Sequence, residues 1–255
     1  MIVRRTIALA ALIGCGTIAG PAGPVDAGGI SVVAAGADAE WVPIVTQDAS
    51  LGRALVSAFF GRPVAGSFAV RLFPDGPSWE GYWRSLGAFG AGPVPCWVIG
   101  GASRGEVALL APRTWNSLTC GHNGQDESYR RGVLAHEIVH LRHLRANPAN
   151  LGVIVPLRWF FEGLAVFGGG QLGSGNRASV RNELAGGPIP SLAGIMNGSE
   201  AYSVAGVLVE YLDRRIGRAA LAALLTATTS EEVLARIGLT ERELLDGFRQ
   251  SVLAP

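Results

Sequence analysis

The sequence predicts an α+β fold in which an N-terminal mixed α/β lobe with a small sheet is followed by a C-terminal helical lobe. From residue 40 to residue 111, short β-type runs alternate with helical ones, a pattern typical of a small sheet with helices packed on it. After about residue 128 the periodic segments are all helical. With 255 residues and 49% hydrophobic content, the chain can bury a substantial core. We therefore expect one domain at residues 40–255, with lobes at about 40–145 and 146–255.

In the N-terminal lobe, hydrophobic patterns and turn residues define the expected elements. Strands are expected at residues 41–46, 67–73, 96–99 and 106–110, and helices at 49–60 and 78–86. The last two strands flank a turn that contains Gly and Ser, which indicates a β-hairpin.

In the C-terminal part, Pro, Gly and capping residues mark where helices begin and end. A helix at about 128–145 stops at Asn147-Pro148, and Pro156 opens the next helix, which ends at the glycines 168–170. Later helix signals are a run at 200–216 closed by Gly217, capping boxes of Thr229 with Glu232 and of Thr240 with Glu243, and a last helix towards Val252.

The N-terminus resembles an export signal. Arg4 and Arg5 followed by an apolar run predict a signal peptide at residues 1–14, and the apolar stretch is too short for a membrane-spanning helix. Residues 12–15, Leu-Ile-Gly-Cys, resemble a bacterial lipobox, in which Cys15 is lipidated and becomes the first residue of the mature chain. The alternative is a conventional signal peptide cut later, near Ala19 or Ala27. The Gly- and Ala-rich residues 15–39 are expected to form a flexible tether.

Cysteine number and charge add two expectations. If Cys15 carries lipid, Cys96 and Cys120 form an even pair in an oxidising compartment and favour one disulfide, the alternative being two free thiols. The net charge of +1 is dispersed along the chain, so no nucleic-acid partner is expected.

The segment His136-Glu137-Ile138-Val139-His140 carries the clearest chemical signal in the chain. Residues four apart lie on one face of a helix, so His136 and His140 can direct two imidazoles at one point. Glu137 is rotated by about 100° from His136, which places its carboxylate beside that point, within reach of a water activated by a metal. Glu162, in the segment 159–165, can supply a third ligand. Two imidazoles and a carboxylate leave the fourth position of a Zn²⁺ ion open, as catalytic zinc sites require.

With these residues, the chain resembles the gluzincin zinc metallopeptidases, and in particular the peptidase MA-like families of bacterial extracytoplasmic proteins. The resemblance rests on HEIVH at 136–140, on WFFEGLA at 159–165 and on AYSVAG at 201–206, and it spans roughly residues 40–252. It implies a zincin-like fold with the active site in the cleft between the two lobes. The gap between His140 and Glu162 is three residues longer than the eighteen-residue gap common in the aminopeptidase branch. Position 166 is Val, where some gluzincins have an acidic residue, so support for the ligands must come from elsewhere.

The resemblance also implies a mechanism, in which zinc activates water while Glu137 takes its proton and delivers it to the leaving amine. Tyr202 is the candidate donor to the oxyanion, its alternative being a core-facing aromatic residue. The strand at 106–110 is expected to be an edge strand that binds substrate backbone, or else a strand that simply closes the sheet.

Other conspicuous residues have simpler interpretations. His143 is expected to be a packing or surface residue, and His122 a solvated loop residue that could touch substrate. Trp159 and Phe160 are expected in the core rather than in a specificity pocket.

The function expected from the sequence is a zinc-dependent peptidase that acts on a peptide or protein substrate. We expect it to be exported and anchored by lipid at the outside of a bacterial membrane, or else secreted or periplasmic and soluble. Two alternatives are a catalytically silent lipoprotein that uses the same fold for binding or assembly, and a metal-dependent hydrolase with a non-peptide substrate.

Overall fold

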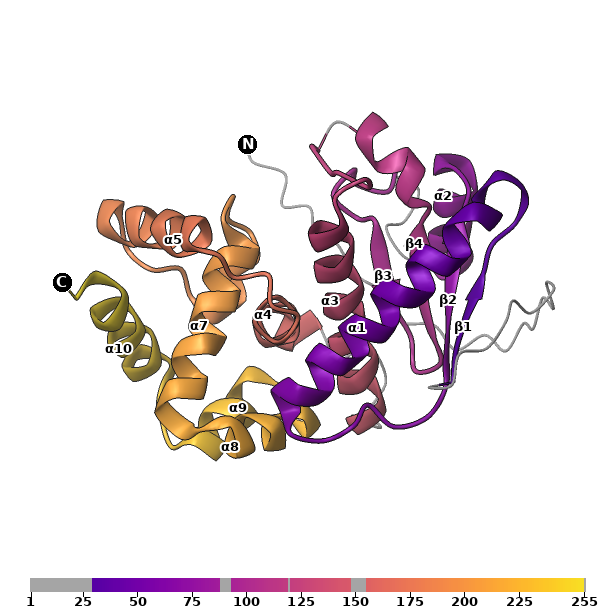
Figure 1. Cartoon of the computed structure of the whole chain (residues 1–255). Helices are drawn as coiled ribbons and strands as arrows, with labels where there is room; N and C mark the ends of the chain where they lie inside the picture. Colours follow the sequence, from indigo (N-terminus) through magenta and orange to yellow (C-terminus); the bar gives the residue numbers. More distant parts are fainter. Residues whose placement is uncertain (1–28, 88–92, 119, 148–154, 255) are drawn as a thin grey trace.

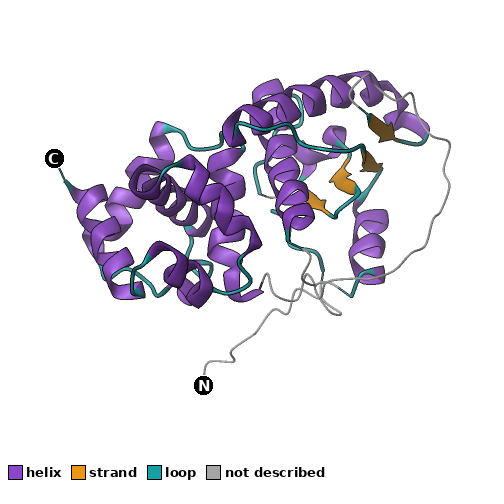
Figure 2. Cartoon of the chain, turned by 90° about the horizontal axis from the view of Figure 1, so that it is seen from below, coloured by secondary structure: helices purple, strands orange, loops and turns teal. Residues whose placement is uncertain are grey.

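The computed structural model describes residues 29–87, 93–118, 120–147 and 155–254. In these ranges the chain has the predicted α+β class, with a small mixed sheet in the N-terminal lobe and helices throughout the C-terminal lobe (Figure 1). Seen from below, the strands form a small group on one side of the molecule and helices make up the other side (Figure 2). The predicted signal peptide and Cys15 lie outside the described residues.

The N-terminal lobe consists of four strands and the helices that cover them. The strands are β1 (Ile30–Val33), β2 (Phe68–Phe73), β3 (Gly100–Ala102) and β4 (Glu106–Leu110), and the helices are η1 (Gly36–Trp41), α1 (Val42–Phe60), α2 (Gly76–Ser85), η2 (Pro112–Ser117) and α3 (Glu127–Ala146). The strand order is β1-β2-β4-β3, with β3 antiparallel to β4 and the other pairs parallel. Parallel neighbours need crossover connections, and α1 provides the one between β1 and β2.

The position of β4 corrects one expectation. The strand at 106–110 pairs with β2 on one side and with β3 on the other, so its backbone groups are used on both sides and it is not an edge strand. Within the described residues, β1 and β3 are the edges of the sheet. The predicted β-hairpin is therefore confirmed, but its edge strand is β3 and not β4.

Three segments differ from the predicted secondary structure. Residues 41–46 belong to η1 and α1 rather than to a strand, because Val45, Ala49 and Val56 are buried at helical spacing, which outweighs the β propensity of the valines. Residues 96–99 precede β3 and are not a strand themselves. Residues 30–33, expected in the flexible tether, form β1, because Ile30 and Val32 are fully buried against β2.

The two long helices α1 and α3 pack side by side on the sheet. A buried ion pair joins them, with Arg130 Nε 2.9 Å from Asp48 Oδ2. Arg130 also donates to the carbonyl of Gly124, just before α3. At the start of α3, the side chain of Asp126 accepts from the backbone N–H of Tyr129, which fixes where the helix begins.

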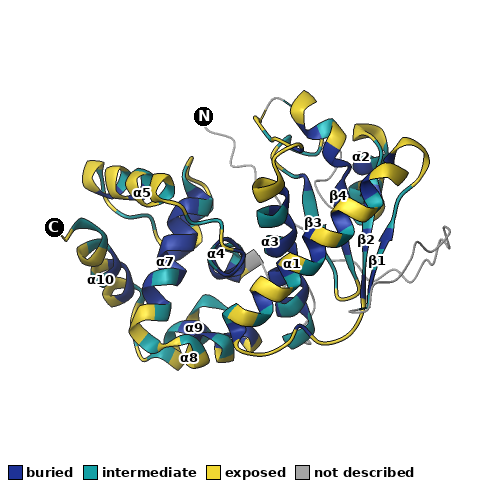
Figure 3. Cartoon of the chain, viewed as in Figure 1, coloured by how far each residue is buried: buried dark blue, intermediate teal, exposed yellow. Residues whose placement is uncertain are grey.

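The C-terminal lobe is built around α4 (Arg158–Gly168) and α7 (Ala201–Ile216), which pack closely on each other. A Cβ atom at Gly163 would collide with the carbonyl oxygen of Ala205, so only glycine permits this approach. The other helices of this lobe are η4 (Val155–Leu157), α5 (Ser174–Gly186), α6 (Leu192–Ile195), α8 (Arg218–Ala223), η5 (Leu224–Thr226), α9 (Ser230–Ile237) and α10 (Glu241–Leu253). In Figure 3, α4 and the middle of α7 are largely buried between the sheet lobe and the outer helices.

The helix ends predicted from residue 128 onwards are largely correct. α3 ends before Asn147, α4 ends at the predicted glycines, and Gly217 caps α7. The capping box of Thr240 and Glu243 is present in full. At Thr229 the side chain caps α9, but Glu232 accepts from the N–H of Thr228 instead. Among the described helices, none has both the length and the hydrophobicity that a membrane span requires.

Candidate metal centre

His136, His140 and Glu162 come together where α3 passes α4. Their three ligand atoms lie within 4.8 Å of one another. Glu162 Oε2 is 3.4 Å from His136 Nε2 and 3.3 Å from His140 Nε2, while the two Nε2 atoms are 2.9 Å apart. Donors at 2.0–2.1 Å from a tetrahedral ion are about 3.3 Å apart, so the two carboxylate distances fit a zinc-sized ion. The donor set and its spacing therefore fit Zn²⁺.

The charge states of His140 and Glu162 suit metal ligands. Burial lowers the pKa of His140 to about 4, which keeps its imidazole neutral. Burial alone would raise the pKa of Glu162, but the adjacent His140 and His136 side chains hold it well below its usual range. Neutral imidazoles and an ionised carboxylate are the forms that bind a metal ion.

Two neighbours fix the orientation of the imidazoles. The amide oxygen of Gln171 lies 2.8 Å from His136 Nδ1, so this nitrogen carries the proton and donates it. His136 Nε2 then has its lone pair directed towards His140 and Glu162. The ring of His140 is stacked on Phe161, with ring centroids 3.9 Å apart and planes inclined by 12°.

Gln171 is the site residue that the sequence did not reveal. It follows the glycine turn at the end of α4 and belongs to no motif, so no local pattern marks it. Val166 cannot hydrogen-bond to a ligand residue, and Gln171 provides such a hydrogen bond to His136 instead. Metal-bound histidines usually donate their second N–H to such a partner, which orients the ring.

Glu137 lies beside the three ligand atoms and not among them, as the helical geometry predicts. Its side chain is buried, and in the described part of the chain its Oε2 atom has no hydrogen-bond partner. Burial raises the pKa of Glu137 to about 7. The nearby His136 lowers this pKa, whereas the negative charge of Glu162 raises it. Such a carboxyl group can accept and release a proton near neutral pH.

The edge strand β3 approaches this carboxylate closely. A Cβ atom at Gly100 would lie 2.5 Å from Glu137 Oε1, so a larger residue at this point of the strand would have to displace the Glu137 side chain. The backbone of β3 thus passes directly next to Glu137.

Tyr202 lies near the site, in the first turn of α7. Its ring centroid lies 6.4 Å from that of His136 and 6.1 Å from that of Trp97. Burial and the charge of Glu162 raise the pKa of Tyr202 well above its usual range, although Arg158 opposes this effect. The hydroxyl is therefore protonated and can act as a donor.

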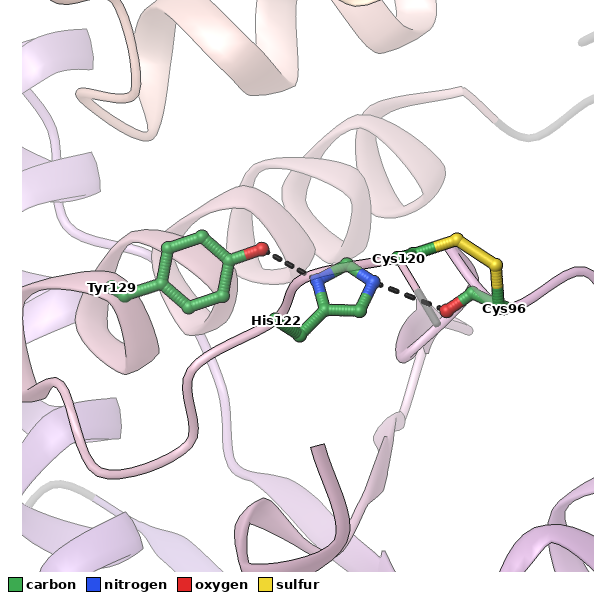
Figure 4. Close-up of a disulfide and its surroundings, with 4 residues drawn as sticks. All are labelled: Cys96, Cys120, His122 and Tyr129. Atoms are coloured by element: carbon green, nitrogen blue, oxygen red, sulfur yellow. Dashed lines mark hydrogen bonds between the residues drawn. A yellow bond between two sulfur atoms is a disulfide. The ribbon is translucent and has the colours of Figure 1, made fainter. Parts of the chain in front are cut away.

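The remaining histidines lie outside the cluster of ligand atoms. His143 is buried against Phe161 and Phe160, as expected of a packing residue. His122 is hydrogen-bonded rather than simply solvated, with Nδ1 2.6 Å from the hydroxyl of Tyr129 and Nε2 3.1 Å from the carbonyl oxygen of Cys96 (Figure 4).

The predicted disulfide between Cys96 and Cys120 is present, with Cα atoms 5.7 Å apart, next to His122 (Figure 4). It ties the segment before β3 to the loop that leads into α3. Trp159 and Phe160 are fully buried, which confirms that they belong to the core.

Comparisons of the chain with protein-family models, with curated proteins and with solved structures find no match. The function proposed for the chain therefore rests on the residues of the site and on their geometry.

Proposed function

We propose that the chain is a zinc-dependent peptidase of the gluzincin type, with His136, His140 and Glu162 as the zinc ligands. One observation carries the proposal: two imidazole nitrogens and a carboxylate oxygen converge within 4.8 Å, next to the buried carboxylate of Glu137. The two histidines come from the sheet lobe and Glu162 from the helical lobe, as the proposed zincin-like arrangement requires.

The residues around this point have suitable roles in the hydrolysis of an amide bond. Bound zinc supplies the Lewis acidity that activates water and polarises the scissile carbonyl group. Glu137 takes a proton from the water and passes it to the leaving amine, for which a pKa of about 7 is well matched. Tyr202 keeps its proton and donates a hydrogen bond to the developing oxyanion.

The edge strand β3 gives a place for an extended peptide. Among the described strands it pairs with β4 alone, and its Gly100 lies against Glu137. A substrate that adds to this strand by β-augmentation brings its backbone next to the proposed base. We therefore propose β3, rather than β4, as the strand that aligns the substrate.

The decisive comparison is between the wild type and Glu137→Gln, assayed for cleavage of an unbiased peptide library at matched zinc content. Glutamine keeps the size and the hydrogen bonding of the side chain but cannot accept the proton. We expect cleavage to fall by a factor on the order of 10² to 10⁴. Glu80→Gln, on the exposed helix α2, is the matched control and should cleave normally.

Two outcomes would reject this function. Equal activity of Glu137→Gln and the wild type would rule out Glu137 as the base. A wild type that binds zinc but cleaves no peptide would instead favour the binding or assembly module, or a non-peptide substrate.

We also propose that the protein is exported and held at the outer face of a bacterial membrane by lipid on Cys15. Metabolic labelling with a fatty acid should mark the wild type and not Cys15→Ser. An unlabelled wild type recovered from the soluble fraction would indicate ordinary secretion instead.

A further inference from the structure

A group of arginines gathers at the end of the sheet where β1 and β2 begin. They come from α1, from the loop between α1 and β2, from the β3–β4 turn and from the end of α3; we define the arginine patch as Arg53, Arg62, Arg104, Arg142 and Arg145. The loop at residues 61–67, which the patch surrounds, runs along the lower edge of the molecule in Figure 1.

Backbone carbonyl groups hold much of the patch in place. Arg145 donates to the carbonyls of Ser67 and Arg104, each at 2.7 Å, and also to that of Ala65. Arg142 Nη1 lies 3.2 Å from the carbonyl oxygen of Pro63, and its guanidinium lies over the ring of Phe60. Carbonyl oxygens orient a guanidinium group but do not neutralise its charge.

The patch is also poor in acidic residues. Within the described residues, the side chains of Arg62, Arg142 and Arg145 form no ion pair. The segments 53–71 and 138–147 contain no Asp or Glu. Glu106, which follows Arg104 by two positions, is already paired with Arg71 at 2.7 Å. The positive charges of Arg62, Arg142 and Arg145 are therefore available to an external anion.

The place of the patch indicates what that anion is. The carbonyl of Gly29, at the start of the described chain, accepts from the N–H of Phe68, next to Ser67 and Arg145. The described chain therefore begins beside the patch. Residues 16–28 can span at most about 45 Å, so lipid on Cys15 keeps this end of the domain close to the bilayer.

We propose that the arginine patch docks on the anionic phospholipid headgroups of the membrane and orients the domain there. Guanidinium groups bind phosphate oxygens through paired, planar N–H donors, and anionic bilayers attract basic clusters that come within a Debye length. The proposal does not depend on the metal centre, but it rests on the lipid anchor proposed for Cys15.

The test measures vesicle co-sedimentation of the full chain in a Cys15→Ser background, which removes the lipid but keeps every other N-terminal residue. Vesicles of phosphatidylcholine alone are compared with vesicles that contain one quarter phosphatidylglycerol, at low and at physiological salt. Stronger binding to the anionic vesicles is expected, and it should weaken with salt.

Variants then identify the surface. Arg62→Gln with Arg142→Gln should lower the partition onto anionic vesicles by roughly 30-fold, equivalent to about 1 kcal/mol for each basic residue. Arg62→Lys with Arg142→Lys keeps both charges and should bind almost like the parent. The control Arg181→Gln with Arg242→Gln removes two exposed charges from α5 and α10 and should have no effect. If the double variant does not fold, Arg62→Gln alone, at an exposed site, should still lower the partition onto anionic vesicles about 5-fold.

Three results would overturn the proposal. The first is equal binding of the parent to both kinds of vesicle. The second is an Arg62→Gln variant that partitions like the parent. The third is capture of soluble polyphosphate, used as a probe, without any preference for anionic vesicles, because this would assign the patch to a polymeric anion rather than to a membrane.

Discussion

At the scale of single residues, the site is defined by which buried polar atoms have partners and which do not. His136 Nδ1 is satisfied by Gln171, while among the described residues His140 Nδ1 and Glu137 Oε2 have no hydrogen-bond partner. Buried polar atoms without partners are costly, and native proteins keep them mainly where chemistry needs them.

Gln171 offers a prediction at this scale. Gln171→Ala removes the acceptor that fixes the tautomer of His136, so zinc affinity should fall by about 10- to 100-fold while the fold is retained. Competition with a chelator of known affinity measures this change. Gln125→Ala, on the exposed loop before α3, is the control. Unchanged affinity in Gln171→Ala would mean that this hydrogen bond does not support the site.

His143 makes stability depend on pH. Burial lowers its pKa to about 3 in the folded chain, against 6.5 for the free group, so the unfolded state binds more protons between these values. The free energy of unfolding should therefore fall as the pH drops below about 6.5, by up to about 1.4 kcal/mol per pH unit for this group. Urea titrations of metal-free wild type and His143→Gln between pH 7 and pH 4 test this, because the variant should lose that part of the slope. The same slope in both proteins would show that His143 does not titrate in this way.

At the scale of elements, a disulfide and a hydrogen bond connect the segments that precede helix α3 and the edge strand β3. The disulfide ties Cys96, which precedes β3, to Cys120, which precedes α3, and His122 binds the carbonyl of Cys96. Trp97, which is 44% exposed, is thereby held against Tyr202. The disulfide and His122 therefore help to place Trp97 next to Tyr202.

Loss of the disulfide should destabilise the chain measurably. Closing a loop with a sequence separation of 24 removes chain entropy from the unfolded state, equivalent to about 3 kcal/mol. Cys96→Ser with Cys120→Ser should lower the free energy of unfolding by roughly 2–4 kcal/mol, measured by denaturant titration. Adding reductant should bring the wild type to the level of the variant and leave the variant unchanged. If reductant leaves the wild type as stable as before, the bridge is not formed in solution.

At the scale of the whole molecule, the proposed metal would link two lobes that already share contacts. Arg218 of α8 donates to the carbonyl of Phe59 at the end of α1, lies 3.6 Å above its ring, and pairs with Asp213 of α7. A ligand that binds only the folded chain adds to its stability. Zinc held by α3 and α4 should thus strengthen the same contact between the lobes.

The sequence predicted what depends on local geometry and missed what depends on packing. A helix with histidines at positions 136 and 140 brings its imidazoles together wherever it lies, so two of the three converging ligand atoms follow from spacing alone. The contact of Gln171 with His136 depends on how α3 and α4 pack, and no spacing rule reveals it. For the same reason the edge strand was predicted wrongly, because the alternation of hydrophobic and polar residues does not reveal the order of the strands.

Zinc content is the most direct test of the central claim. Purified wild type should contain one zinc ion per chain by elemental analysis, and His136→Ala, His140→Ala and Glu162→Ala should each lose it, because each removes a ligand atom. His143→Gln, one turn further along α3, should retain the metal. A zinc content that is the same in the wild type and in all three ligand variants would contradict the site.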